Sequence, residues 1–247
     1  MSKSKSVVSF GGGVNSTALL VGLYEREERP DAVLFADTGG ERPETYQHVR
    51  RMSEWCVGVG FPEIVTVSKG ITLEQDCLDR ETLPSKAFGF PSCSDHFKVR
   101  PQKKWIAESG WKDVVWLIGI HKGEIQRAKK NTDPFVRFPL IEWGWGQEDC
   151  VDAIRCNGLP IPPKSACFFC PSMKKQEILE LKRDNPELFE RAVEMERNAK
   201  EAGTLTTTKG LGRRFSWESL AKADEAQLRL PIFDDSQPPI CDVCIDW

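Results

Sequence analysis

The sequence has little net charge, no apolar run long enough to cross a membrane, no internal repeat and no low-complexity tract. The formal charge of −3 argues against a protein that coats nucleic acid non-specifically, although a local basic groove remains compatible with a near-neutral total. The first residues, Met1–Ser6, lead directly into an apolar run and do not resemble a signal peptide. We therefore expect a protein that does not enter membranes and is located in the cytoplasm.

Histidine is scarce, with three residues, whereas nine cysteines are present. A cytoplasmic compartment keeps thiols reduced, so the cysteines favour metal binding or redox chemistry over a disulfide framework. With 29% charged and 40% hydrophobic residues, the composition is that of an ordinary globular protein. At 247 residues the chain can bury one sizeable core, or form a main domain with a smaller appendage.

Short apolar runs alternate with helical patterns in the first part of the chain. The predicted strands are residues 7–10, 32–36, 64–67 and 114–118. The predicted helices between them are residues 16–26 and 43–56. This alternation predicts an α/β fold, a doubly wound parallel sheet whose ligands bind at the carboxyl ends of the strands.

The pattern changes after Trp143, where strand signals fade. Residues 69–100 are predicted to form a loop or short-helix insertion near the site, and residues 158–163 are typical of a rigid linker. The later predicted helices are residues 147–157, 172–183, 187–202 and 217–229. We therefore expect a nucleotide-binding α/β domain over residues 1–142 and a helical, cysteine-bearing lobe over residues 143–247.

The most informative segment joins the first predicted strand to the first predicted helix. Its three glycines, Gly11–Gly13, let backbone N–H groups approach an anion, and the start of the next helix adds donors and the positive end of its dipole. Ser16 can add a hydroxyl donor. The pattern predicts a phosphate cradle, with a strand-to-helix turn that binds nothing as the alternative.

Three segments that follow apolar strands are predicted to share one pocket: Gly11–Ser16, Asp37–Glu44 and Gly119–Arg127. Together with Phe138–Trp143, these blocks resemble the PP-loop (HUP-like) adenine-nucleotide alpha hydrolases, and within them the phosphoadenosine-phosphosulfate (PAPS) reductase-like group. The sequence SFGGGVNS is similar to the SGGxDS loop of that superfamily, and DTGGERPET is similar to its DTGxxxPET signature. The resemblance extends from about Val7 to Met173.

The resemblance implies that these blocks bind ATP, or a PAPS-like adenine nucleotide, with Mg²⁺. The residues implied to bind the nucleotide are Ser9, Phe10, Gly11, Gly12, Gly13, Asn15, Ser16, Asp37, Thr38, Gly39, Gly119 and Ile120. Candidate catalytic residues are Ser16, Asp37 and Arg127, although Asp37 can instead cap a turn and Arg127 can form a surface ion pair. Asn15 replaces the usual Asp of the loop, which argues against metal binding by that side chain.

Two Cys-x-x-Cys pairs, Cys167/Cys170 and Cys241/Cys244, have the spacing of a four-cysteine site for structural zinc or an iron–sulfur cluster. The stretch CSDHFKVRP, which begins at Cys93, resembles a block of cluster-bearing adenylyl-sulfate reductases and of the ATP-pyrophosphatase component of DNA phosphorothioation. This second resemblance implies that Cys93, Cys167 and Cys170 ligate a [4Fe–4S] cluster. Cys241 or Cys244 would supply the fourth ligand.

The complete glycine loop favours an ATP pyrophosphatase that releases AMP and pyrophosphate as it adenylates a substrate, and that acts as a sulfurtransferase on a nucleic acid or nucleoside. The first alternative is a PAPS or adenylyl-sulfate reductase, but the chain lacks the ECGLH-like tail of those enzymes. The second is a non-catalytic adenine-nucleotide-binding module with structural zinc. Expected partners are the adenine nucleotide, a nucleic-acid substrate, a sulfur-donor protein and a second copy of the chain.

A basic and aromatic segment, Lys209–Trp217, has two interpretations. It can contact phosphates and stack on a base, or it can be a solvated loop before a helix that Ser216 caps, with Trp217 buried. A second basic cluster consists of Lys98, Arg100, Lys103 and Lys104. If both segments line one groove, a polynucleotide substrate is favoured.

Overall fold

A five-stranded parallel sheet forms the centre of the computed structural model, which describes residues 4–84 and 92–228. The strands are β1 (Lys5–Phe10), β2 (Ala32–Asp37), β3 (Ile64–Ser68), β4 (Val114–Ile118) and β5 (Val136–Arg137). Their spatial order is β3-β2-β1-β4-β5, so the direction of winding reverses between β1 and β4. The predicted doubly wound α/β fold is confirmed, and ligands of such folds bind at the reversal point.

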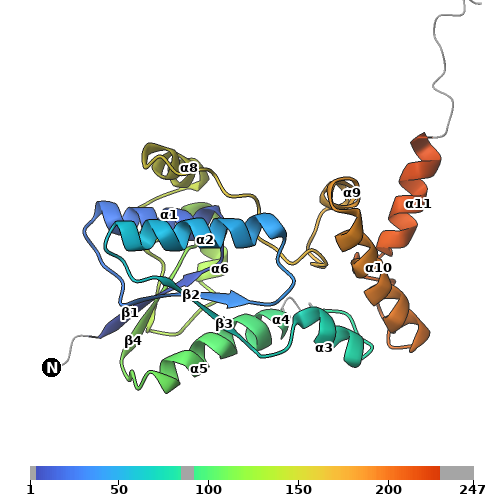
Figure 1. Cartoon of the computed structure of the whole chain (residues 1–247), viewed down its shortest axis with the longest axis horizontal. Coiled ribbons are helices and arrows are strands. Elements are labelled where there is room, and N and C mark those ends of the chain that lie inside the picture. The colour runs from blue at the N-terminus through green and yellow to red at the C-terminus, as the bar shows by residue number, and fades with distance from the viewer. Residues whose placement is uncertain (1–3, 85–91, 229–247) are drawn as a thin grey trace, which may run out of the picture.

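Helices cover both faces of the sheet, as Figure 1 shows. One face carries α1 (Val14–Glu25), α2 (Pro43–Gly58) and α8 (Gln147–Cys156), and the other carries α5 (Arg100–Glu108). Alternate residues of β1 divide between the two sides: Val8 and Phe10 share a core with Leu19 of α1, whereas Val7 shares one with Ile106 of α5. Burial on both faces explains why the predicted strands are continuous apolar runs.

Short helices occupy much of residues 69–84 and 92–100, the described parts of the predicted insertion. They include α3 (Leu73–Asp79), α4 (Ser92–Ser94) and a π-helical turn over Asp95–Val99 that continues into α5. The Thr72 hydroxyl caps α3 by accepting a hydrogen bond from the Gln75 N–H at 3.1 Å. These short helices confirm the short-helix form of the predicted insertion, although helices of this length are too short to produce an apolar periodicity from which their bounds could be predicted.

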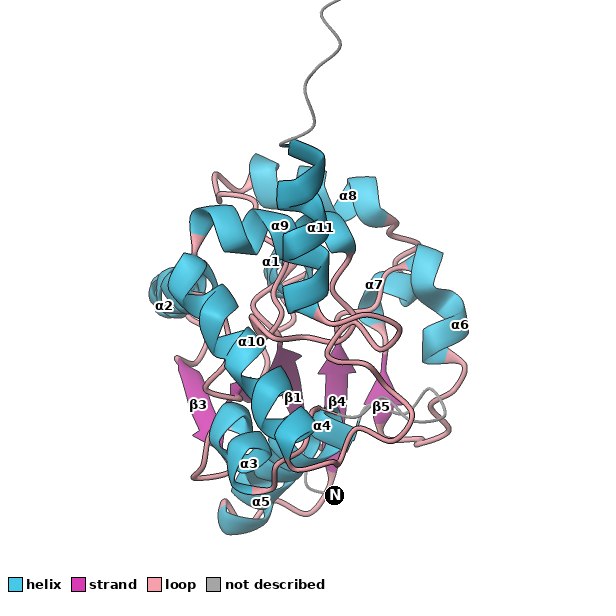
Figure 2. Ribbon diagram, turned by 90° about the vertical axis from the view of Figure 1, so that its right-hand side faces the viewer, coloured by secondary structure: helices cyan, strands magenta, loops and turns pink. Residues whose placement is uncertain are grey.

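The C-terminal region is helical, as predicted. It contains α9 (Lys175–Asp184), α10 (Pro186–Glu201) and α11 (Trp217–Leu228). These helices bury a second core that includes Phe168, Phe189 and Trp217 together with Leu73 of α3. In Figure 1 they lie to the right of the sheet, beyond the end to which β2 points, and Figure 2 shows them from that side. The division at residues 142 and 143 remains a prediction.

Three short helical segments complete the described chain. They are a 3-10 turn at Lys122–Glu124, α6 (Ile125–Ala128) and α7 (Pro139–Glu142). Within residues 4–84 and 92–228, no helix combines the length and the apolar character that spanning a membrane requires.

Candidate functional site

The glycine loop joins β1 to α1 at the carboxyl edge of the sheet. Gly12 has a φ of +73°, a left-handed conformation that glycine adopts without a steric penalty. Gly13 is the N-cap of α1, and its carbonyl accepts the first helical hydrogen bond, from Thr17 N–H at 3.0 Å. The N–H groups of Val14, Asn15 and Ser16 lie in the first turn, where no preceding helical carbonyl can accept them. The loop therefore fits a bound anion.

The Ser16 hydroxyl shapes this loop from within. It accepts a hydrogen bond from Gly13 N–H at 3.3 Å and donates one to Gly13 O at 3.0 Å, and the residue is only 7% exposed. Ser16 therefore stabilises the start of α1 in the structure as it stands, so a catalytic role would require its hydroxyl to exchange these partners for a ligand.

Three other predicted binding residues, Ser9, Phe10 and Ile120, lie in the strands or just after them. The side chains of Phe10 and Ile120 are buried, and the Phe10 ring stacks against His48. Ser9 lies in the middle strand pairing, opposite Leu34 of β2 and Ile118 of β4. The side chains of Phe10 and Ile120 pack in the core, so only the backbone N–H and C=O groups of these two residues are left to face a ligand.

The end of β4 lies against the start of α1. A Cβ atom at Gly119 would come within 2.7 Å of the Asn15 carbonyl oxygen, so only glycine fits this approach. The Asn15 side-chain amide donates to Glu124 Oε2 at 2.9 Å, and Arg127 Nη1 donates to Glu124 Oε1 at 3.3 Å. Glu124 thus connects the glycine loop to Arg127, a predicted catalytic residue whose side chain is 67% exposed.

Asp37 closes the turn after β2. Its Oδ1 accepts hydrogen bonds from Gly39 N–H at 2.7 Å and from the Tyr46 hydroxyl at 2.8 Å. Burial and the Asp37 carboxylate both raise the pKa of Tyr46, so the phenol stays protonated and acts as the donor. Gly39 has a φ of +69°, which a non-glycine residue rarely adopts. Asp37 therefore caps this turn, and one of its oxygens has both of these donors.

The segment before α9 crosses the carboxyl ends of β1 and β2. Cys167 pairs with Glu41 in an isolated antiparallel bridge, and Phe168 N–H donates to Gly40 O at 2.8 Å. The Thr38 hydroxyl lies 3.1 Å from Cys167 Sγ. At the other end, a Cβ atom on Gly13 would come within 2.8 Å of Ser165 Oγ. The cysteine segment and the glycine loop are therefore in direct contact.

Three of the predicted metal-ligating cysteines lie on this side of the molecule. Burial, and then the charge of Cys170, raise the pKa of Cys93. Burial, Glu41 and, to a lesser degree, Cys170 raise the pKa of Cys167 to about 12. The electrostatic interaction of Cys170 with both other thiols means that α4 and the Cys167–Cys170 turn bring the three sulfurs into one neighbourhood.

These thiols are soft donors of the kind that zinc and iron–sulfur clusters take. In the part of the chain that the structure describes, no three His, Cys, Asp or Glu side chains already stand at metal-ligating positions. The other two predicted ligands, Cys241 and Cys244, lie outside the described residues. The donor chemistry thus fits a thiolate-bound group, and the assignment of Cys93, Cys167 and Cys170 as its ligands stays a prediction.

An ion pair lies beside Cys167. Glu41 has a fully buried side chain, and its Oε1 accepts from Lys98 Nζ at 3.0 Å. Burial lowers the pKa of Lys98, but the charges of Glu41, Cys167 and Cys170, together with the hydrogen bond to Glu41, outweigh this effect and raise the pKa, so Lys98 stays charged. Glu41 Oε2 and Arg42 Nε are buried without a hydrogen-bond partner among the described residues. Buried polar atoms are rarely unpaired, so these two atoms fit a site that binds a further polar group.

Sequence reasoning missed three of these residues. Tyr46 and Ser165 carry no local motif, and Glu41 belongs to the DTGGERPET block but was not singled out. Lys98 belongs to the second basic cluster of the sequence, with Arg100, Lys103 and Lys104. In the structure, Lys98 pairs with Glu41, and Arg100 pairs with Asp95 at 2.8 Å.

Comparison with known proteins gives one family match and two curated relatives. A family model described as the phosphoadenosine phosphosulfate reductase domain matches residues 5–163. The uncharacterised proteins MJ0066 and MJ0973 of Methanocaldococcus jannaschii are 26% identical over 211 residues and 25% identical over 202 residues, respectively. Each alignment covers 76% of this chain, but only 41% and 46% of the relative. The chain therefore spans less than half the length of either relative.

Two solved structures are distantly similar. A phosphoadenylyl-sulfate (PAPS) reductase from Candida auris, in a phosphate complex, has 16% identity and a TM-score of 0.46, over 65% of this chain and 76% of that one. The U34-tRNA thiolase NcsA from Methanococcus maripaludis, with its [4Fe-4S] cluster, has 13% identity and a TM-score of 0.43, over 90% of this chain and 81% of that one. At such low scores, the site has to be interpreted from the residues of this chain.

Proposed function

Because this chain belongs to the phosphoadenosine phosphosulfate reductase domain family, we propose that it is an enzyme that binds an adenine nucleotide at the Gly11–Ser16 loop. The nucleotide is ATP, which is cleaved to AMP and pyrophosphate as a substrate oxygen is adenylated. The activated substrate then receives sulfur. One observation carries the proposal: residues 165–167 touch Gly13 through Ser165 and Thr38 through Cys167, so the phosphate cradle and the thiols share one surface.

In the first step, a substrate oxygen attacks the α-phosphorus of ATP, and the bond to the pyrophosphate oxygen breaks. Negative charge moves onto the departing pyrophosphate, where the N–H groups of Val14, Asn15 and Ser16 can stabilise it. Mg²⁺ is proposed to accompany ATP and to neutralise part of this charge. Asp37 and Arg127 are proposed to act at the same edge, Asp37 from its capped turn and Arg127 through Glu124.

In the second step, hydrosulfide displaces AMP from the activated carbon. A C–S bond forms, the C–O bond to AMP breaks, and no net electrons are transferred. The proposed ligands of a [4Fe–4S] cluster are Cys93, Cys167, Cys170 and one of Cys241 and Cys244, and the cluster, when bound, would supply the sulfur atom. The acceptor is proposed to be a nucleic acid or nucleoside, and the sulfur is proposed to come from a donor protein.

The cofactor is tested on protein purified without oxygen. We expect about four iron atoms and equivalent acid-labile sulfide per chain, with thiolate-to-iron absorption. Cys167→Ser should lose this iron. Cys156→Ser is the matched control, because Cys156 is exposed and outside the cysteine neighbourhood, and it should keep it. A colourless protein that contains zinc would overturn the cluster and leave only the structural-zinc alternative.

The reaction is tested by incubating the same protein with ATP, Mg²⁺ and candidate nucleic acids, and by measuring AMP and pyrophosphate. We expect both products in equal amounts, with a rate about tenfold lower in Ser16→Ala, which removes one hydroxyl from the loop. Absence of release with every nucleic acid and nucleoside would overturn the proposal. Release of sulfite from PAPS or adenylyl sulfate in the presence of thioredoxin would instead establish a reductase.

A further inference from the structure

The basic segment Lys209–Trp217 forms a tight loop between α10 and α11. Lys209 N–H donates to Arg213 O at 2.7 Å, and Arg213 N–H donates to Gly210 O at 2.9 Å, so the loop closes on itself. Trp217 is fully buried, and the Ser216 hydroxyl accepts from Ser219 N–H at 3.1 Å. The expectation of a loop before a capped helix is therefore confirmed.

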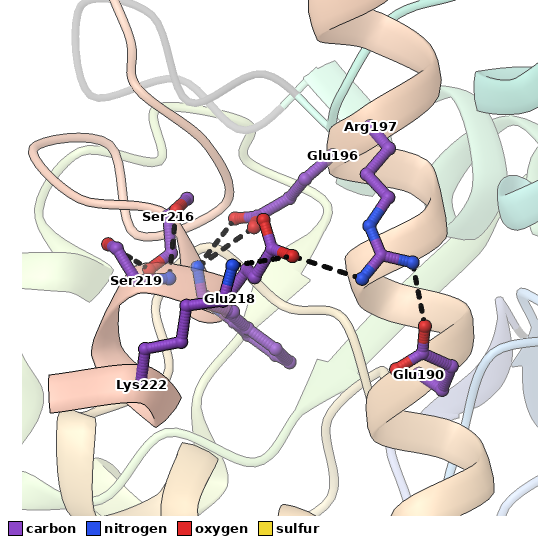
Figure 3. Close-up of polar contacts among 8 residues, drawn as sticks. Glu190, Glu196, Arg197, Ser216, Glu218, Ser219 and Lys222 are labelled. Carbon is purple, nitrogen blue, oxygen red and sulfur yellow. Dashed lines mark hydrogen bonds and ion pairs between the residues drawn. The ribbon is translucent and has the colours of Figure 1, made fainter. Parts of the chain in front are cut away.

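A buried carboxylate anchors this loop. Glu196 of α10 is 4% exposed and accepts hydrogen bonds from Leu211 N–H at 2.6 Å and from Trp217 N–H at 2.8 Å. Figure 3 shows the Glu196 side chain directed from α10 toward the start of α11. Gly210 packs so closely on this carboxylate that a Cβ atom there would overlap Oε1. The Glu196 carboxylate therefore fixes both ends of the segment from Leu211 to Trp217.

The anchored loop holds Arg213 in an unusual backbone conformation. Its φ is +64°, in the left-handed region that non-glycine residues rarely occupy. Residues kept in such conformations are concentrated at binding and catalytic sites. The left-handed backbone of Arg213 therefore makes the surroundings of its side chain a candidate binding site.

Arg213 lines a cavity of about 350 Å³, which is large enough for a small organic ligand. Thr206–Thr208 line the same cavity, as do Cys93 and His96. The glycine loop, Gly11–Ser16, contributes nothing to it. The cavity therefore borders Cys93 but is separate from the glycine loop that is proposed to bind ATP.

One of the cations that line this cavity, Arg213, is not paired with an acidic residue in the described part of the chain. In the part of the chain that the structure describes, the Arg213 guanidinium has neither an ion pair nor a hydrogen bond. The carboxylate in the wall, Asp76, is neutralised by Lys69 at 2.8 Å and by Arg80 at 3.3 Å. His96 also borders the cavity, and its Nε2 lies 3.7 Å from Asp95. A free guanidinium thus faces a cavity whose own acid is already paired.

Hydroxyl groups add to this donor set. Thr206, Thr207 and Thr208 have no side-chain hydrogen bond to any residue described, whereas the neighbouring Thr204 uses its hydroxyl to bind Ala199 O at 2.9 Å. Three hydroxyls and a guanidinium offer more donors than the two oxygens of a carboxylate can accept. A tetrahedral phosphate has enough oxygens, and arginine binds it through two parallel N–H groups.

We propose that this cavity binds the phosphate group of a nucleotide or of a nucleic-acid strand end. Its volume leaves room for the attached sugar, and Cys93 in its wall puts the ligand beside the cysteines. The identification of this ligand as the sulfur acceptor rests on the proposed function, but its binding does not. Binding can therefore be measured without ATP and without turnover.

The test is isothermal titration calorimetry with 5′-CMP and with cytidine, which avoid the adenine site. We expect 5′-CMP to bind and cytidine to bind at least about tenfold more weakly. Arg213→Gln should weaken 5′-CMP by about tenfold and leave ATP binding unchanged. Arg214→Gln is the matched control, because Arg214 is also exposed but does not line the cavity, and it should bind like the native protein.

A second variant and a second ligand complete the test. Thr207→Val removes one hydroxyl and should weaken 5′-CMP by about threefold without changing the melting temperature. Tighter binding of a 5′-phosphorylated oligonucleotide than of 5′-CMP would identify a strand end, and the reverse order a free nucleotide. Equal binding by Arg213→Gln and the native protein, or equal binding of 5′-CMP and cytidine, would overturn the proposal.

Discussion

The hydroxyl of Thr38 lies 3.1 Å from the sulfur of Cys167, although 129 positions separate the two residues. Thr38 follows β2, and Cys167 lies in the segment that pairs with Glu41. Two positions before Cys167, Ser165 leaves no room for a side chain on Gly13. This one segment therefore holds a thiol and the glycine loop in a fixed relation.

The contact between Gly13 and Ser165 can be tested by adding one methyl group. A Cβ atom at position 13 would lie 2.8 Å from Ser165 Oγ, closer than real Cβ atoms approach. We expect Gly13→Ala to lower the free energy of unfolding by about 1–3 kcal/mol, measured by urea denaturation. In the Ser165→Ala background the nearest remaining atom is Ser165 Cβ at 3.7 Å, so the loss should be at least about 1 kcal/mol smaller. Strictly additive effects would contradict the contact.

Asn15 can be converted to the aspartate that the superfamily loop usually has at this position. The Asn15 amide donates to Glu124 Oε2 at 2.9 Å, so Asn15→Asp would bring two carboxylates together. We expect a loss of about 1–2 kcal/mol in the free energy of unfolding at pH 7, and a smaller loss near pH 4, where one carboxyl takes up a proton. Adding Glu124→Gln should restore the stability. An unchanged urea midpoint for the single variant would refute this explanation.

His48 should make stability depend on pH. It is 3% exposed, its ring lies 2.8 Å from the Thr17 hydroxyl, and burial together with the charge of Arg51 lowers its pKa to about 4. Below pH 6.5 the unfolded chain binds a proton at this histidine that the folded chain does not bind until about pH 4. Its contribution is therefore complete above pH 6.5 and is lost as the pH falls toward 4, by about 3 kcal/mol in total.

Urea denaturation at pH 7, 6, 5 and 4 checks this prediction. His48→Gln should lower stability at pH 7 and flatten its decline toward pH 4. His96→Gln is the control, because that side chain is 41% exposed, and it should decline like the native protein. Parallel curves for His48→Gln and the native protein would show that another group controls the decline.

The role of Glu196 as the anchor of the Lys209–Trp217 loop can be tested by comparing a tightly packed glycine with one that has open space around it. Gly210 packs against the Glu196 carboxylate, and Gly58, the last residue of α2, has no atom within 4 Å of the Cβ position. We expect Gly210→Ala to cost about 2–4 kcal/mol, because a displaced carboxylate loses its bonds to Leu211 and Trp217. Gly58→Ala should instead gain up to about 1 kcal/mol. Thermal melting measures both, and similar shifts for the two would be inconsistent with the anchor.

The sheet could be predicted because its central strands are buried on both faces, which makes them apolar runs that end in recognisable loops. Strand β5 was missed because it has two residues, Val136 and Arg137, and so carries no pattern. The bounds of helix α3, which lies in the predicted loop or short-helix insertion, could not be predicted because seven residues are too few to show helical periodicity.

The candidate site was predictable only where its chemistry is local. Glycines after β1 and Asp37 after β2 are visible as motifs, since neighbouring residues define them. The contact of Ser165 with Gly13 and the pairing of Lys98 with Glu41 depend on how distant segments meet, which spacing along the chain does not encode. Lys98 was therefore grouped only with the basic residues near it in the sequence, although its ammonium group lies 3.0 Å from a buried carboxylate.

The crossing segment also orders events in time. A ribosome completes β1, α1 and β2 long before it reaches Cys167, and a contact across 129 positions forms only after that whole length has been made and its loop closed. During synthesis, the glycine loop is thus made before Cys167, whose segment contacts it in the folded chain. The contact between Thr38 and Cys167 can therefore form only after the residues up to Cys167 have been made.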